Sequence, residues 1–255
     1  MKKVLSFLAI AAMVMVACTK NNGGNTDKPG TDPGTTDPGT TPEPEYVAPI
    51  DIDGQFADWA KLDASKVASA TCPAGAKYEE LKLVKVYADE QFVFFYCEFT
   101  PNLEGYVTMD VFLNADNSPA TGGYSDHWGE PDIEWLFEGA VDGWDAGLYK
   151  WWGEVGENGW NWTDPSVEHD GSDNWGAIIG EGAGVTSAAG DPAAGKVEFS
   201  IMREAVADLI TFADEFTVGF MLSADWAEAG FLPTATLTDD NPNGIAPKLK
   251  VKVVK

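Results

Sequence analysis

Short apolar runs separated by turn residues constrain the fold of this 255-residue chain more than any other feature. Apolar and polar side chains alternate over 107–114, 132–138 and 196–202, which is the pattern of strands that bury one face. The run 92–99 is apolar on both faces, as a central strand would be. Further strands are expected at 47–52, 80–88, 216–223 and 248–254. The pattern predicts an all-β fold, an antiparallel β-sandwich of jelly-roll type with at most one short helix, near 203–210.

The same alternation assigns faces to individual side chains. The sets expected to point inward are Val107, Met109, Val111 and Leu113; Ile133, Trp135 and Phe137; Val197, Phe199 and Ile201; and Leu249, Val251 and Val253. Lys248, Lys250 and Lys252 alternate with the last set and are expected on the outer face. Trp135 is therefore predicted to be a core residue.

The first eighteen residues have the organisation of an export signal. Lys2 and Lys3 precede an apolar run at 4–17, which is shorter than the ~18 apolar residues that a membrane-spanning helix needs. The tetrapeptide MVAC at 15–18 resembles a bacterial lipobox. This resemblance implies a lipoprotein signal peptide over 1–18, with Cys18 as the lipidated first residue of the mature protein. An ordinary secretory signal is the alternative.

Residues 19–45 are dense in Thr, Pro, Gly and Asp, and TDPGT occurs twice. Such a segment has almost nothing apolar to bury, so a disordered stalk is predicted. This leaves 46–255 as a single β-sandwich domain. We expect a lipid anchor in the bacterial cell envelope, in the outer membrane of a Bacteroidetes-type cell. The sequence leaves open whether the domain faces the periplasm or the cell surface.

The chain has a formal net charge of −25, which excludes nucleic acid and anionic lipid as partners and suits neutral ligands or cations. The sequence has no nucleotide-binding glycine motif. Besides Cys18, the cysteines are Cys72 and Cys97. Export permits a disulfide between them, and two buried thiols are equally consistent with the sequence.

Two segments resemble a known family. Ile52, Asp53 and Gly54 are followed by Asp58 and Trp59, and this resembles the opening of the DOMON-like carbohydrate-binding modules related to family 9. The resemblance continues through LNADNSPATGG and the acidic, aromatic segment after it. It implies a β-sandwich that binds glycans and holds structural calcium. Gly54 would supply a turn, Asp53 would accept a bond from the backbone after it, and Trp59 would lie under the sandwich edge.

The turn at 114–123 is rich in oxygen ligands of the kind that calcium prefers. The candidate calcium ligands are Asn114, Asp116, Asn117, Thr121 and Asp132. The role expected of the ion is to fix the loop. A plain Asx turn between strands is the alternative.

Eight of the ten tryptophans lie between 128 and 175, and four of them fall in WWGEVGENGWNW, residues 151–162. Indole rings pack flat on the C–H faces of pyranose rings, while carboxylates and amides bind the hydroxyls. The candidate sugar-binding residues are Trp151, Trp152, Trp160, Trp162, Trp128, Trp144, Asp145, Glu154 and Asn161. The alternative is a hairpin whose tryptophans cover the sandwich.

The sequence thus predicts a non-catalytic lipoprotein that binds a neutral polysaccharide or oligosaccharide. Two alternatives stay open. One is a structural or protein-interaction lipoprotein of the envelope, without sugar affinity and with an envelope protein as partner. The other is a glycosidase, which needs two carboxyls about 5 to 9 Å apart, a pattern that arises by chance among 41 acidic residues.

Overall fold

The computed structural model describes residues 46–159, 161–163, 165, 177–178 and 186–255. The chain divides into two compact units, Met1–Tyr46 and Val47–Lys255, and every described strand lies in the second. Cys18 and the predicted stalk lie outside the described residues. Within the described part of the chain, we find no helix with the length and hydropathy needed to cross a bilayer.

The described residues form fifteen strands and three single-turn 3-10 helices, which confirms the all-β prediction. The strands are β1 (Ala68–Thr71), β2 (Leu81–Asp89), β3 (Phe92–Phe99), β4 (Val107–Asn114), β5 (Gly123–Tyr124), β6 (Pro131–Ile133), β7 (Trp135–Ala140), β8 (Gly143–Trp151), β9 (Trp162–Thr163), β10 (Ala177–Ile178), β11 (Thr186–Asp191), β12 (Lys196–Met202), β13 (Glu215–Ala224), β14 (Ala227–Leu232) and β15 (Leu249–Val254). The helices are η1 (Asp58–Ala60), η2 (Ala64–Lys66) and η3 (Glu204–Val206). The last of these lies within the segment where a short helix was expected.

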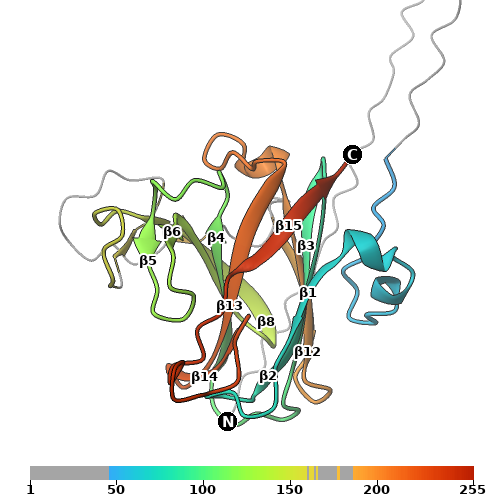
Figure 1. Ribbon diagram of the computed structural model, residues 1–255. Helices are drawn as coiled ribbons and strands as arrows, with labels where there is room; N and C mark the ends of the chain where they lie inside the picture. Colours follow the sequence, from blue (N-terminus) through green and yellow to red (C-terminus); the bar gives the residue numbers. More distant parts are fainter. Residues whose placement is uncertain (1–45, 160, 164, 166–176, 179–185) are drawn as a thin grey trace, which may run out of the picture. The chain divides into compact units, whose positions relative to one another are not determined.

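The strands pack as a sandwich whose two layers are joined by one strand (Figure 1). One layer has the order β10-β8-β7-β4-β13, with β9 on β8 and β14 on β13. The other has the order β2-β3-β12-β11, with β1 on β2. β15 pairs antiparallel with β13 and parallel with β2, so the whole sheet is mixed. A separate two-stranded sheet, β5-β6, lies beside the first layer.

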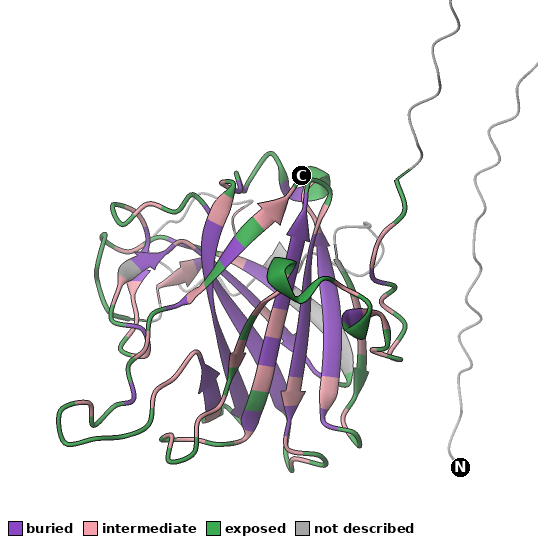
Figure 2. Cartoon of the chain, turned by 45° about the vertical axis from the view of Figure 1, so that its right-hand side comes forward, coloured by how far each residue is buried: buried purple, intermediate pink, exposed green. Residues whose placement is uncertain are grey.

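The main core lies between the layers, and Figure 2 shows the buried residues running along the strands. Phe95 of β3 stacks on Phe199 of β12 with centroids 4.8 Å apart, and it meets Phe220 of β13 edge-on at 6.0 Å. The inward sets of β4 and β12 are all in this core, as the alternation predicts. On β15, Val251 is buried in it, with Leu249 and Val253 partly buried against it.

Two smaller apolar clusters cover the outer faces of the layers. Ile50, Trp59, Tyr87, Phe94 and Tyr96 form one, where the segment before β1 packs on β2 and β3. The other consists of Phe112, Trp128, Ile133, Leu136, Met221 and Phe231. It shows that the outer face of β4 and β13 is also covered by chain, which the strand pattern does not reveal.

The motif that carries the family resemblance is organised by one buried carboxylate. Glu198 of β12 accepts hydrogen bonds from the backbone N–H groups of Asp53 (3.1 Å) and Gly54 (2.9 Å) and from Trp59 Nε1 (3.0 Å). Gly54 has φ +77°, and Asp53 Oδ1 accepts from Gln55 N at 2.9 Å. The expected turn, backbone bond and buried tryptophan are therefore present. The segment itself is not a strand, contrary to the expectation for 47–52.

Three details of the predicted faces and strands differ in the structure. Ile133 belongs to β6 and packs in the outer cluster, whereas Trp135 and Phe137 of β7 are in the main core. The strand is interrupted at Glu134, so the alternation does not carry across it. Lys248, expected on the outer face, precedes β15 and is buried in an ion pair with Asp132. The alternation also fails to predict β1, β8, β11 and β14.

Cys72 and Cys97 are free thiols, so the free-thiol alternative describes this structure. Cys97 is buried in the main core, and Cys72 is half-buried against it. Burial raises the pKa of both thiols, which makes them poor nucleophiles.

Candidate functional site

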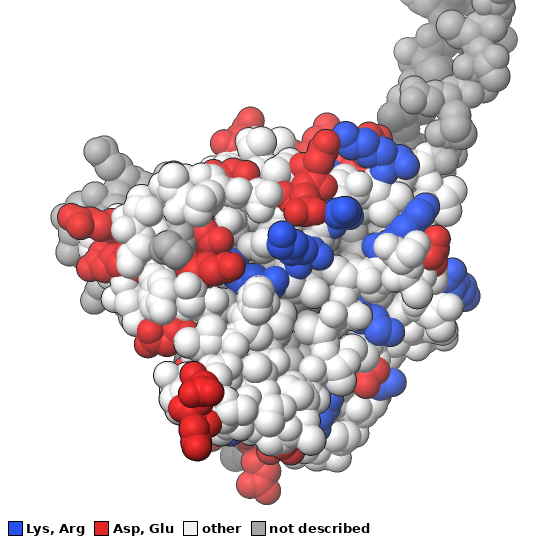
Figure 3. Space-filling view, in the orientation of Figure 1, with Lys and Arg blue, Asp and Glu red and all other residues white. Residues whose placement is uncertain are grey.

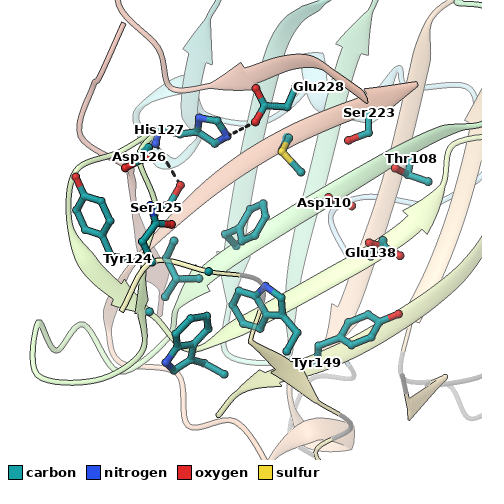
Figure 4. Close-up of a pocket in the computed structure, with 18 of the residues that line it drawn as sticks. Thr108, Asp110, Tyr124, Ser125, Asp126, His127, Glu138, Tyr149, Ser223 and Glu228 are labelled. Atoms are coloured by element: carbon teal, nitrogen blue, oxygen red, sulfur yellow. Dashed lines mark hydrogen bonds and ion pairs between the residues drawn. The ribbon is translucent and has the colours of Figure 1, made fainter. Parts of the chain in front are cut away.

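A pocket of about 670 Å³ lies on the outer face of the layer that contains β4, β7, β8 and β13 (Figure 4). Its floor comes from the strands, with Thr108, Asp110, Phe112, Ile133, Glu138, Tyr149, Met221 and Ser223. Its walls come from the short strands β5 and β9, the ends of β8 and β14, and the segments between strands, with Gly123, Tyr124, Ser125, Asp126, His127, Trp151, Asn158, Gly159, Trp162, Trp226 and Glu228. The volume is within the range of small-ligand sites.

The strand register explains how the floor is built. On β4, Met109 and Val111 point into the main core, so Asp110 between them points the other way. Asp110 lies directly opposite Glu138 of β7 on one side and Met221 of β13 on the other. The pocket floor is therefore the outward-facing half of the alternation, where two carboxyl side chains lie side by side among apolar residues.

Two glycines let aromatic rings lie close to the backbone here. A Cβ on Gly147 would lie 2.5 Å from the ring of Tyr149, and a Cβ on Gly123 would lie 2.7 Å from the ring of Trp151. Real Cβ contacts are not this short. The absence of a side chain at these positions thus makes room for two rings that line the pocket.

The aromatic wall is formed by residues 151 and 162. Trp151 is 8% exposed, and its Nε1 donates to the carbonyl of Glu154 at 3.2 Å. Its ring meets Trp162 edge-on, with centroids 5.4 Å apart, and Trp162 in turn contacts Phe112 at 6.0 Å. The two tryptophans of the WWGEVGENGWNW segment that line the pocket are therefore anchored on the outer cluster.

The opposite wall is the segment from Tyr124 to His127. Tyr124 N donates to Glu157 O at 2.8 Å, which ties this segment to the tryptophan-rich loop. The ring of His127 stacks on Phe231 at 4.3 Å, and its Nε2 is 3.1 Å from Glu228 Oε1. Burial lowers the pKa of His127, although Glu228 acts in the other direction.

Asp110 and Glu138 give the floor an unusual electrostatic state. Asp110 is 2% exposed, and within the described part of the chain its Oδ1 has no hydrogen-bond partner. Burial, and then the neighbouring Glu138, raise the pKa of Asp110 well above its ordinary value, and burial also raises the pKa of Glu138. The pKa of Tyr149 rises to about 12, first through burial and then through these two carboxyls. Perturbed groups gathered in a pocket are typical of functional sites.

Trp226 forms part of the pocket rim, and its backbone has a positive φ angle that tryptophan rarely adopts. Asp225 (φ +49°) and Trp226 (φ +67°) form the two-residue turn between β13 and β14. Both positive φ values match the hairpin turn that normally takes Asn and Gly. Trp226 is nevertheless 73% exposed, and its ring lies 5.5 Å from that of Tyr106. Trp226 is thus a large exposed ring in a strained turn beside the pocket.

Several residues predicted to bind sugar lie elsewhere. Trp128 is buried in the outer cluster, with Nε1 donating to Pro233 O at 3.1 Å. Trp152 is 42% exposed and does not line the pocket, and neither do Glu154 and Asn161. Trp160 and the side chains of Trp144 and Asp145 lie outside the described residues.

Among the pocket residues that the sequence did not single out for ligand binding are Asp110, Tyr124, Glu138, Tyr149 and Trp226. The period-two alternation does place Asp110 and Glu138 on the face opposite the core, and this was the available signal. Trp226 lies far along the chain from the tryptophan-rich segment, so clustering in sequence cannot find it.

The predicted calcium ligands separate into two groups. Asp116 and Thr121 approach Glu134, whose Oε1 accepts from Thr121 Oγ1 at 2.7 Å. Asn114 Oδ1 accepts from Ser118 N at 3.1 Å, and Asn117 is exposed with φ +57°. Asp132 instead pairs with Lys248, which also lies 3.2 Å from Glu130. Among the described residues, no three His, Cys, Asp or Glu side chains form a metal-binding group.

Glu134 is the residue of this loop whose pKa is strongly shifted. Burial, and then contact with the Asp116 carboxyl, raise the pKa of Glu134 to about 8. A cation bound between the carboxyls of Glu134 and Asp116 would offset the effect of Asp116 on the pKa of Glu134.

Comparison of the chain with protein-family models, curated proteins and solved structures finds no match.

Proposed function

We propose that residues 46–255 are a non-catalytic glycan-binding domain and that the pocket on β4, β7, β8 and β13 is its binding site. The observation that carries this proposal is the meeting of Trp151, Trp162 and Trp226 around one open pocket that has carboxyl groups on its floor. The resemblance of the segments around Asp53 and Asp116 to DOMON-like modules supports it.

The pocket chemistry suits a sugar. The indoles of Trp162 and Trp226 and the phenol of Tyr149 offer apolar surfaces to pyranose C–H groups. Asp110, Glu138 and Ser223 offer acceptors and donors to hydroxyl groups. Stacking would position the ring, and the polar groups would select among sugars by their hydroxyl patterns.

Binding is favoured over hydrolysis by the arrangement of the acids. Glycosidases place two carboxyls on either side of the scissile bond, roughly 5 to 9 Å apart. Asp110 and Glu138 occupy directly opposite positions on neighbouring strands of one sheet, so both approach a bound sugar from the same side. Release of product from a polysaccharide would contradict the non-catalytic part of the proposal.

The anchor and the ion belong to the proposal as well. The signal-like 1–18 with Cys18 and the stalk-like 19–45 support a lipid-anchored protein of the bacterial envelope. Calcium fits the loop after β4 if Glu134 replaces Asp132, because Asp116, Glu134 and Thr121 already converge there. Asp132 is neutralised by Lys248 and does not fit.

The test is a titration of intrinsic tryptophan fluorescence with soluble polysaccharides and oligosaccharides, in the presence of calcium. We expect a saturable change with a subset of the panel, weakened about tenfold or more by Trp162→Ala. Trp152→Ala is the matched control, because Trp152 lies in the same segment but outside the pocket. A flat response from the folded protein across the panel would instead favour a structural or protein-interaction lipoprotein.

A further inference from the structure

We infer that Asp110 and Glu138 form a subsite for a positively charged ammonium group, so that the glycan bound in this pocket carries a free primary amine, as an amino sugar does. This inference rests on the proposed glycan-binding function. It replaces the neutral sugar expected from the sequence with a cationic one.

The geometry of the pair comes from the strand register. Asp110 of β4 is directly opposite Glu138 of β7, and both line the pocket. Side chains at such positions have Cβ atoms about 4.5–5.5 Å apart, so one group of atomic size can contact both carboxyls. In Figure 4 the two side chains lie together on the floor, between Tyr149 and Thr108.

Neither carboxyl has a cationic partner among the described residues. The groups that share the floor with them are Thr108, Tyr149, Met221 and Ser223, none of which carries positive charge at neutral pH. The basic side chain that lines the pocket, His127, is paired with Glu228 on the opposite wall. On the face shown in Figure 3, Lys and Arg gather over and beside β15, while Asp and Glu surround β5 and β6.

The buried carboxyl of Asp110 points to a ligand rather than to a solvated acidic face. Asp110 is 2% exposed, and its Oδ1 has no hydrogen-bond donor among the described residues. Buried charged groups in proteins are normally paired, because an unpaired one is strongly destabilising. Asp132 of β6, which is also buried, has its counter-ion in Lys248. At Asp110 no described residue supplies such a partner, so the carboxyl either keeps a proton or takes its counter-ion from a ligand.

An ammonium group satisfies this floor better than a hydroxyl does. It brings a positive charge and three N–H donors, enough for both carboxyls, whereas a hydroxyl brings one donor and no charge. Tyr149 and Trp162 line the same pocket and can contact the cation through their rings.

The pair also makes binding depend on pH. The raised pKa values of Asp110 and Glu138 mean that the floor keeps its protons to a higher pH than ordinary carboxyls do, and an ammonium group must displace them. Affinity for the amine therefore rises as pH increases through the range where the pair ionises, and binding releases protons. Tyr149, with a pKa of about 12, stays neutral throughout this range, and His127 with Glu228 and Asp126 lies at the opposite wall.

The experiment compares sugars that differ only at one position. Oligosaccharides of glucosamine and of galactosamine are titrated calorimetrically into the whole chain, beside their N-acetylated forms and the corresponding neutral oligosaccharides. Two buffers of different ionisation enthalpy report the protons released. We expect one free-amine series to bind about tenfold or more tightly than its acetylated form at pH 7, with less preference at pH 5.5.

Asp110→Asn and Glu138→Gln keep the shape of each side chain and remove its charge. Each is expected to abolish the amine preference, whereas Glu90→Gln, an exposed change of the same charge at the β2–β3 turn, leaves it intact. Equal affinity for amine, acetylated and neutral sugars would overturn this inference and leave the proposed function standing. An amine preference that survives both substitutions would also overturn it. Binding of no sugar of any class would overturn the proposed function together with the inference.

Discussion

Glu198 and Asp110 are both buried carboxyl-bearing residues on central strands, yet their surroundings are opposite. Glu198 receives two backbone N–H groups and one indole N–H from the segment 53–59. Asp110 faces a second carboxyl, and no described residue donates to its Oδ1. The first carboxyl fastens one segment of the chain to the sandwich, and the second lies beneath a pocket that its residue lines.

The difference distinguishes a buried carboxyl that stabilises the fold from one that is available to a ligand. A buried charge whose bonds are all supplied by the chain stabilises the fold that supplies them. A buried charge without such bonds destabilises the fold, and it persists where a ligand makes use of it. Two tryptophans follow the same division: Trp59, which donates to Glu198, is buried, whereas Trp226, on the rim of the pocket that Asp110 lines, is exposed in a turn with positive φ.

The largest effect is expected at Glu198. Glu198→Ala leaves the buried indole N–H of Trp59 and two part-buried backbone N–H groups without their acceptor, so we expect a loss of about 4 kcal/mol in the free energy of unfolding. For a domain of this size that lowers the melting temperature by roughly 10 °C, measurable by circular dichroism. Glu198→Gln, which keeps one acceptor oxygen, should lose about half as much. A melting temperature unchanged in both variants would show that Glu198 does not have the structural role assigned to it.

Asp110→Asn is expected to act in the opposite direction. The pKa of Asp110 is raised in the folded state, so its favourable contribution is complete below the unfolded pKa of about 3.9 and is lost as pH rises toward the folded value. The variant should therefore match the wild type near pH 3.5 and exceed it by about 1–2 kcal/mol at pH 7.5. Urea unfolding at the two pH values measures this. Destabilisation at pH 7.5 would mean that Asp110 is a structural carboxyl after all.

Trp226→Gly tests whether this residue contributes to glycan affinity while it lowers the stability of the fold. Glycine adopts φ +67° without steric penalty, which offsets the lost contact with Tyr106, so we expect a stability gain of less than about 1 kcal/mol. Affinity for the glycan should fall about tenfold in the same variant. Thermal melting and titration of one preparation give both numbers, and unchanged affinity would remove Trp226 from the site.

Calcium is expected to have the smallest effect. Millimolar calcium should raise the stability by about 0.5 kcal/mol at pH 8 and by less at pH 6, because the pKa of Glu134 is about 8 and the ion requires its ionised form. Glu134→Gln should remove the response. A response that persists in this variant would place the ion elsewhere.

The sequence predicts the sandwich well because a strand that buries one face has apolar residues at every second position. Met109 and Val111 point into the core as the alternation requires, and Phe95 and Phe94 fill the two faces of β3. β8 was missed because glycines and aromatic residues replace the alternation there. Those residues serve the pocket: Gly147 makes room for the ring of Tyr149.

The pocket was less predictable because outward-facing polar residues look alike whether they meet solvent or a site. Asp110 and an exposed residue such as Lys250 occupy equivalent positions in their alternations. What distinguishes Asp110 is the segment 123–128 and the tryptophan-rich loop, which fold over its strand from elsewhere in the chain. Trp128 shows the converse case, since this tryptophan, predicted to bind sugar, is buried in the outer cluster.

The position of β15 has a consequence for how the molecule comes into being. β15 is the last strand in chain order, yet it stands between β13 and β2 in the middle of the sheet order. During synthesis on the ribosome, the stretches of β13 and β2 that pair with β15, residues 215–218 and 88–89, therefore lack their partner until residues 249–254 emerge. A nascent chain cut short before that point would retain most of its core residues and still expose these two short edges, so we expect such a truncated product to aggregate.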